Sequence, residues 1–350
     1  MNARQMKAVA AVVLLATVCM AQAAITVQTV AVGDVGNLAD TRYATPGYGA
    51  VSYAYRIGKY EITAGQYTSF LNAVARTDTY ELYNTQMDTD VYVYGCNIKR
   101  TGSSGNYVYS VAADWANRPV NFVTWGDAAR FVNWMNNGQI SGAQDLTTTE
   151  DGAYYLNGAT TNDQLSAVTR KANWKWAIAN ENEWYKAAYY KGGSTIAGYW
   201  DYPTQSDTPP SNVGSDGYTD PSNHANYNTG GAPPAGYTIG DPYHHTIVGE
   251  FENSGSAFGT FDQGGNLFEW TETFRETFSG QRRILRGGSY DASLEDMLAE
   301  NYMSMSSTWD WNDDIGFRLV EIPEPATAAI LALGAGLLTK RRLLRASATD

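Results

Sequence analysis

The side chains best suited to do chemistry lie in three short blocks near the end of the chain. They are Gly264-Gly265-Asn266-Leu267-Phe268-Glu269-Trp270, Arg286-Gly287-Gly288-Ser289-Tyr290 and Gly316-Phe317-Arg318. Carboxylate, amide and main-chain carbonyl oxygens are the ligands that hard cations such as Ca²⁺ prefer. The Glu269 carboxylate could therefore bind calcium, or it could accept hydrogen bonds from loop amides without an ion.

No nucleophile motif accompanies these blocks. The sequence contains no Gly-x-Ser-x-Gly turn, no phosphate-binding loop and no Cys-x-x-Cys pair. Its two cysteines are Cys19, in the apolar N-terminal stretch, and Cys96. Because only Cys96 remains once an N-terminal signal is removed, we expect no internal disulfide.

The three blocks occur in this order and spacing in the formylglycine-generating enzyme family, also called the sulfatase-modifying factor family, and the chain resembles that family. The resemblance extends from about Tyr55 to Val320. It implies an α+β, C-type-lectin-like fold that is rich in loops and low in regular secondary structure.

The resemblance also locates the catalytic centre of the family. Formylglycine-generating enzymes oxidise a cysteine of a target sulfatase with oxygen and a copper(I) ion held by two thiolates. The matching positions here are Ala292 and Met297, and neither side chain forms a thiolate. Met297, Met303 and Met305 offer only thioethers, and Cys96 is interpreted as a small buried hydrophobe. We therefore expect no copper and no catalytic residue of the family type.

Two calcium sites are implied by the resemblance. The first set of ligands falls on Asp262, Gly265, Leu267 and Glu269, where Asp262 replaces the usual asparagine with a second carboxylate. The second set, which crosses a variable loop, falls on Asn226, Tyr227, Asp241 and Tyr243.

The same blocks line the substrate groove in the family. The resemblance therefore implies five candidate residues for binding an extended peptide or a sugar: Asn266, Trp270, Arg286, Ser289 and Arg318. The structural alternative, which we favour, is that their Gly and Arg residues fix turns and buried hydrogen bonds. A relative in ergothioneine biosynthesis binds iron through three histidines. This chain has His224, His244 and His245 after the N-terminal segment. Because adjacent residues in a strand point to opposite sides, His244 and His245 should not bind one iron ion together.

Helices and short strands should position these residues. Threonines or an asparagine precede each expected helix, and apolar residues recur on one helical face. The first expected helix starts after Thr63, with Gln66 as capping partner and the apolar face Tyr67, Phe70, Leu71 and Val74. The second starts after Thr124, has the apolar face Trp125, Ala128, Val132 and Met135, and ends at Asn137-Gly138; the third covers 181–190, after Asn180 with Glu183 as capping partner. The expected strands are 55–62, 117–123, 174–178 and 316–320.

Both ends read as sorting signals. Residues 1–23 combine basic, apolar and small residues in the order of a secretory signal peptide. Residues 321–350 hold Pro323-Glu324-Pro325, a short apolar run and a basic end, and resemble a PEP-CTERM tail, which an exosortase-type protease cleaves. The domain then spans 24–320, with a core of 55–320. The apolar run is shorter than the roughly 20 residues needed to span a bilayer, so we expect only transient membrane association.

The charge balance excludes some partners. Losing both ends changes the formal charge from −12 to about −17. So acidic a surface repels nucleic acid and suits cations. We therefore expect an exported, non-catalytic, calcium-stabilised binding module at the outer surface or in the exopolysaccharide matrix of a Gram-negative bacterium, with an exopolysaccharide or extended peptide as ligand. The alternatives are an oxidoreductase acting on a protein cysteine or another thiol through a non-standard metal site, and a matrix component without a specific ligand.

Overall fold

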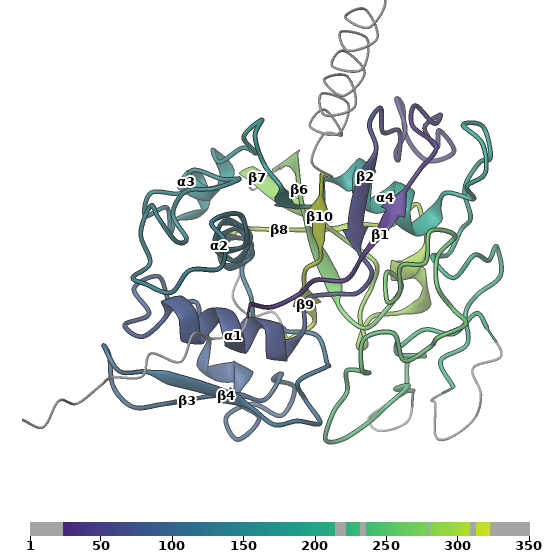
Figure 1. Cartoon of the computed structure of the whole chain (residues 1–350). Coiled ribbons are helices and arrows are strands. Elements are labelled where there is room, and N and C mark those ends of the chain that lie inside the picture. The colour runs from purple at the N-terminus through teal and green to yellow at the C-terminus, as the bar shows by residue number, and fades with distance from the viewer. Residues whose placement is uncertain (1–23, 214–221, 232–235, 279, 309–312, 323–350) are drawn as a thin grey trace, which may run out of the picture.

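The computed structural model describes residues 24–213, 222–231, 236–278, 280–308 and 313–322 (Figure 1). The expected signal segment 1–23, and the tail from residue 323 onward, lie outside this range. The helices are α1 (Ala64–Val74), α2 (Trp125–Asn136), α3 (Asn162–Ser166) and α4 (Glu181–Tyr189), with 3₁₀ turns η1 (Thr85–Met87) and η2 (Leu294–Met297). Among the described residues, no helix has the length and apolar character that crossing a membrane requires.

The strands form three small sheets. They are β1 (Thr29–Val32), β2 (Tyr55–Gly58), β3 (Ile98–Thr101), β4 (Val108–Val111), β5 (Trp176–Ile178), β6 (Phe268–Thr277), β7 (Gly280–Arg286), β8 (Met303–Met305), β9 (Ile315–Gly316) and β10 (Leu319–Glu321). One sheet has the order β1-β2-β10-β5, a second has the order β8-β7-β6-β9, and β3 pairs with β4. Between α4 and β6 the described chain forms only isolated bridges, so loops dominate that half of the molecule (Figure 1).

The helix starts agree with the sequence. The hydroxyl of Thr63 accepts the Gln66 N–H (3.2 Å) and the Gln66 side chain accepts the Thr63 N–H (2.9 Å), which closes the predicted capping box of α1. Asn180 and Glu183 form the same arrangement at α4. At α2, Thr124 caps as expected, but its partner is the unpredicted Asp127.

The core lies where α1 and α2 pack together with the first sheet. The apolar faces predicted for both helices are buried, and their aromatic rings meet at 5.2 Å between the centroids of Phe70 and Phe131. Phe317, between β9 and β10, packs on the ring of Phe131, with 5.4 Å between the two centroids. A residue of the third sequence block therefore belongs to the central core.

Four of the expected elements need correction. The strand 55–62 stops at Gly58, and the strand 174–178 begins at Trp176. Segment 117–123 forms one bridge rather than a strand, and Pro119 within it has no N–H to donate. The strand 316–320 is split, because β9 joins the sheet of β6 while β10 joins the sheet of β2. Helix α3 was not predicted.

Candidate functional site

The three sequence blocks meet at the start of β6. Glu269 in β6 lies opposite Arg286 of β7 on one side and Gly316 of β9 on the other. Arg318 follows two residues after Gly316, on the short connection to β10. Segments that lie about 50 residues apart in the sequence are thus joined by strand pairing.

Glu269 and Arg318 form a buried ion pair. Arg318 Nε lies 2.6 Å from Glu269 Oε2 and Arg318 Nη2 lies 2.5 Å from Oε1, so the contact is bidentate. The indole N–H of Trp184 also donates to Oε2, at 2.7 Å. Both charged side chains are fully buried, and every oxygen of the carboxylate has a partner.

The first predicted calcium set does not fit the ion in this arrangement. The charge of Glu269 is balanced by the Arg318 guanidinium, which takes both oxygens of the carboxylate. Asp262 accepts the Gly249 N–H at 2.6 Å, and burial raises the pKa of its carboxyl to about 6. The N–H of Leu267 donates to Glu61 at 3.1 Å, which fixes the turn at its main-chain amide.

The second predicted set fits calcium in part. The amide of Asn226 donates to His244 and Asn266, both at 3.0 Å, while its buried Oδ1 has no hydrogen-bond partner in the described structure. An orphaned amide oxygen of this kind is a suitable ligand for a hard cation. The Asp241 side chain is 86% exposed, and its Oδ1 lies 2.9 Å from His244 Nε2.

The other two residues of that set are already engaged. The predicted ligands there are main-chain carbonyls: that of Tyr227 accepts from Asn212 and Thr238, and that of Tyr243 accepts the His245 N–H at 2.6 Å. Within the described ranges, no group of three or more His, Cys, Asp or Glu side chains is gathered so as to hold a metal ion.

The two positions matched to the copper thiolates lie in apolar surroundings. Met297 is fully buried in a small cluster with Tyr202, Ala225 and Tyr227. Its Cγ also blocks the space beside Gly288, where an added Cβ would meet it at 3.0 Å. Ala292 is half-buried against the main core. Cys96 is buried elsewhere in that core, and burial raises the pKa of its thiol to about 11, so it stays protonated.

The five groove candidates are buried, so their side chains do not line a surface groove. None is more than 1% exposed: Asn266, Trp270, Arg286, Ser289 and Arg318. Arg286 donates to Glu181 and to two main-chain carbonyls, and the Trp270 indole donates to Val123. The structural alternative is therefore the better description, because the polar groups of these side chains make hydrogen bonds inside the protein.

The three histidines do not converge. His244 lies against Tyr94, at 4.6 Å between ring centroids, whereas His224 stacks on Phe251. Burial lowers the pKa of His245 to about 3, so its imidazole is neutral. Its Nε2 faces the Asp313 carbonyl at 3.2 Å rather than another imidazole.

A surface of tyrosines and carboxylates was missed by sequence reasoning. We call it the tyrosine surface. Tyr94 and Tyr237 each lie 6.1 Å from Tyr290, centroid to centroid. The Tyr237 hydroxyl donates to Asp291 at 2.6 Å. The complete surface comprises Tyr92, Tyr94, Tyr237, His244, Tyr290, Asp291, Asp313 and Asp314.

Its members come from four separate loops, which explains why no spacing pattern indicated them. The available signal was the pair Tyr290-Asp291, which continues directly from the Arg286 block. Burial, followed by repulsion from Asp313, raises the pKa of Asp314 to about 7. Asp291 is exposed, so the surface presents negative charge beside half-buried aromatic rings.

Comparisons with known proteins identify the family and the fold. Residues 19–322 match the family model described as "Sulfatase-modifying factor enzyme 1-like domain". The crystal structure of CarF is similar, with a TM-score of 0.50 and 19% identity over 85% of this chain and 99% of that one.

Two further solved structures have lower scores. Treponema denticola variable protein 1 has a TM-score of 0.46 and 18% identity (84% and 95% covered), and PvdO from Pseudomonas aeruginosa has 0.43 and 17% (85% and 92% covered). No curated protein sequence matches significantly. The expected α+β, C-type-lectin-like, loop-rich fold is confirmed. The chain belongs to the sulfatase-modifying factor enzyme 1-like domain family.

Proposed function

We propose that this chain is an exported, non-catalytic binding domain of its family, which holds an extended basic peptide on the tyrosine surface. The main support is Met297, whose buried thioether fills the position of a copper-binding thiolate. A thioether can neither exchange disulfides with a substrate thiol nor act as an anionic ligand for copper(I). An oxidoreductase that uses a non-standard metal site is the alternative.

The chemistry of the tyrosine surface favours a cationic ligand. Lysine and arginine side chains bind the faces of aromatic rings, and nearby carboxylates strengthen that attraction. Tyr92, Tyr94 and Tyr237 are only half-buried, so their rings remain accessible beside the exposed Asp291. The net charge of −12 further attracts a basic segment over longer range.

Peptide binding can be measured by fluorescence polarisation with the full chain. The probe is a labelled peptide carrying Cys-x-Pro-x-Arg, and its partner replaces Arg with neutral citrulline. We expect Asp291→Asn to weaken binding of the Arg peptide by about tenfold, because a charge-assisted contact is lost. Asp163→Asn, at an exposed aspartate in α3, serves as the matched control and should change nothing. Equal binding of the two peptides would contradict the proposal.

The absence of catalysis is tested with the same peptide. After aerobic incubation with the protein and added copper(I), mass spectrometry should find the cysteine without conversion to formylglycine. Formation of the aldehyde in amounts that depend on the protein would favour the oxidoreductase instead.

Calcium remains part of the proposal, now at the second set, where Asn226 supplies the orphaned oxygen. A ligand that binds only the folded state stabilises it by about 2.7 kcal/mol at 100 times Kd. We expect Ca²⁺, and not Mg²⁺, to raise the melting temperature, and Asp241→Asn to reduce that rise. If Ca²⁺ raised the melting temperature of Asp241→Asn as much as that of wild type, Asp241 would not be a calcium ligand.

The location of the protein is likewise a proposal, supported by the two terminal sequences. We propose that an exosortase-type protease cleaves near Pro323 and that the domain reaches the outer surface or the exopolysaccharide matrix. The intact mass of the extracellular protein tests this, since an uncleaved C-terminus would contradict it. The acidic charge supports the expectation that nucleic acid is not a partner.

A further inference from the structure

A second polar site lies at the start of α2, and it shares no residue with the tyrosine surface. A half-enclosed cavity of about 580 Å³ is bounded by the loop 79–85, the first turn of α2 and Thr160. Its volume falls within the range of small-molecule sites, roughly 300–1,000 Å³. We call it the α2 pocket, and its principal lining residues are Tyr80, Tyr83, Arg100, Asp127, Arg130 and Thr160.

The carboxylate of Asp127 lines this pocket with only one of its two oxygens hydrogen-bonded to the described residues. Its Oδ2 accepts both the N–H (2.8 Å) and the hydroxyl (2.7 Å) of Thr124. Its Oδ1 accepts no hydrogen bond from any described residue, although the side chain is only 6% exposed. This oxygen is not sealed inside the protein but opens onto the cavity, where a ligand hydroxyl can donate to it.

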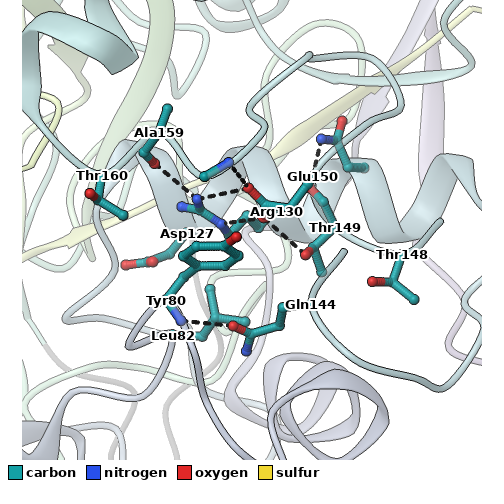
Figure 2. Close-up of polar contacts among 12 residues, drawn as sticks. Tyr80, Leu82, Asp127, Arg130, Gln144, Thr148, Thr149, Glu150, Ala159 and Thr160 are labelled. Carbon is teal, nitrogen blue, oxygen red and sulfur yellow. Dashed lines mark hydrogen bonds and ion pairs between the residues drawn. The ribbon is translucent and has the colours of Figure 1, made fainter. Parts of the chain in front are cut away.

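Arg130 contributes a donor from the next turn of the helix. Its Nε and Nη2 bind Glu150, and Nη2 also binds the Ala159 carbonyl, as Figure 2 shows. The guanidinium lies over the Tyr80 ring at 4.2 Å. Its Nη1 makes no hydrogen bond to the described residues and lies beside Gly126, where an added Cβ would come within 3.4 Å of it.

The charges around the pocket favour a neutral ligand. Arg130 is balanced by Glu150, and Arg100 lies 3.4 Å from Asp78, so neither guanidinium is free to bind a phosphate or carboxylate strongly. The exposed carboxylate of Glu81 also lines the pocket, so the lining carries no excess positive charge that would attract an anion. What remains is an oxygen acceptor and an N–H donor, beside tyrosine rings that can pack on apolar C–H groups.

From this arrangement we infer that the α2 pocket binds a neutral saccharide unit. Neighbouring hydroxyls of a sugar ring donate to Asp127 Oδ1 and accept from Arg130 Nη1, and the C–H face packs against Tyr80. This site goes beyond the peptide function proposed above, and either one can fail without the other, because the two surfaces have no residue in common.

Isothermal titration of the full chain tests the inference. The probes are glucose, galactose, mannose and N-acetylglucosamine, with glucuronate and glucosamine as charged counterparts, at concentrations well above about 1 mM. We expect at least one neutral sugar to bind, and its charged counterpart to bind less well. Asp127→Asn should weaken binding by about tenfold, since a charge-assisted hydrogen bond becomes a neutral one.

A second variant keeps the test independent of the helix cap. Thr160→Trp places a large ring at the exposed rim and should abolish binding while leaving the melting temperature unchanged. Asp163→Asn, the matched control, should bind like wild type. The inference is overturned if no neutral sugar binds, if glucuronate binds best, or if both pocket variants bind like wild type.

Discussion

Two buried carboxylates in this protein lie near arginines but serve different ends. Glu269 has both oxygens engaged, by Arg318 and Trp184. Asp127 uses one oxygen to cap α2 and presents the other to a cavity. The first carboxylate belongs to a block shared with the family, whereas the second lies in a segment where the resemblance indicated no chemistry. The block around Glu269 therefore serves the scaffold, whereas the carboxylate that is open to a cavity lies on α2.

This difference follows from the energetics of buried charge. A buried ion pair gives little net stability relative to apolar packing, but leaving one partner alone costs several kcal/mol. A fully satisfied pair such as Glu269–Arg318 therefore resists change and has no capacity left for a ligand. An unsatisfied oxygen lowers stability slightly and keeps its capacity to bind.

The largest expected effect comes from breaking the closed pair. Glu269→Gln removes the bidentate partner of the fully buried Arg318 and leaves it only the charges of Glu61 and Asp262, so it should cost about 3–5 kcal/mol in the free energy of unfolding, measured in urea. The control is Glu321→Gln, whose contact with a half-exposed Arg56 is 3.7 Å long and should be worth less than about 1 kcal/mol. A comparable loss on removing calcium from wild type would instead support a metal at Glu269.

Much of the scaffold was predictable because its signals are local. A cap such as Thr63 and an apolar face such as Tyr67 with Phe70 depend on neighbours within a few residues. The three blocks near Glu269 were also identified, through the resemblance. Their burial was not, since Asn266 and Ser289 look like surface polar residues until their partners are known.

The candidate sites were hidden because their members are distant in sequence. Tyr94, Tyr237 and Tyr290 meet only through loops that have no periodic pattern. Arg318, the ion-pair partner of Glu269, is 49 residues away in the sequence. The sequence alone therefore could not decide whether Glu269 binds calcium or pairs with an arginine. Asp127 reads as an ordinary helix residue, and only the cavity beside it indicates another role.

A smaller effect is the pH dependence of stability that Asp127 causes. Burial raises the pKa of Asp127 from 3.8 to about 6. Between those values the folded state binds more protons than the unfolded state, so this group's contribution to stability falls as pH rises from about 4 to 7. Asp127→Asn lacks this titration. The stability of the variant minus that of wild type should therefore increase by about 3 kcal/mol between pH 4 and pH 8, measured by urea unfolding. A difference independent of pH would contradict the raised pKa.

The smallest effect compares two threonine helix caps, one beside the α2 pocket and one away from it. Thr63→Ala and Thr124→Ala each remove an N-cap hydroxyl and should each cost about 1 kcal/mol in thermal unfolding. Thr124 additionally donates its hydroxyl to Asp127, so its loss frees the carboxylate to rotate within the α2 pocket. We therefore expect Thr124→Ala to weaken saccharide binding by a few fold, and Thr63→Ala to leave it unchanged. Equal binding by the two variants would show that the cap does not orient Asp127 toward the ligand.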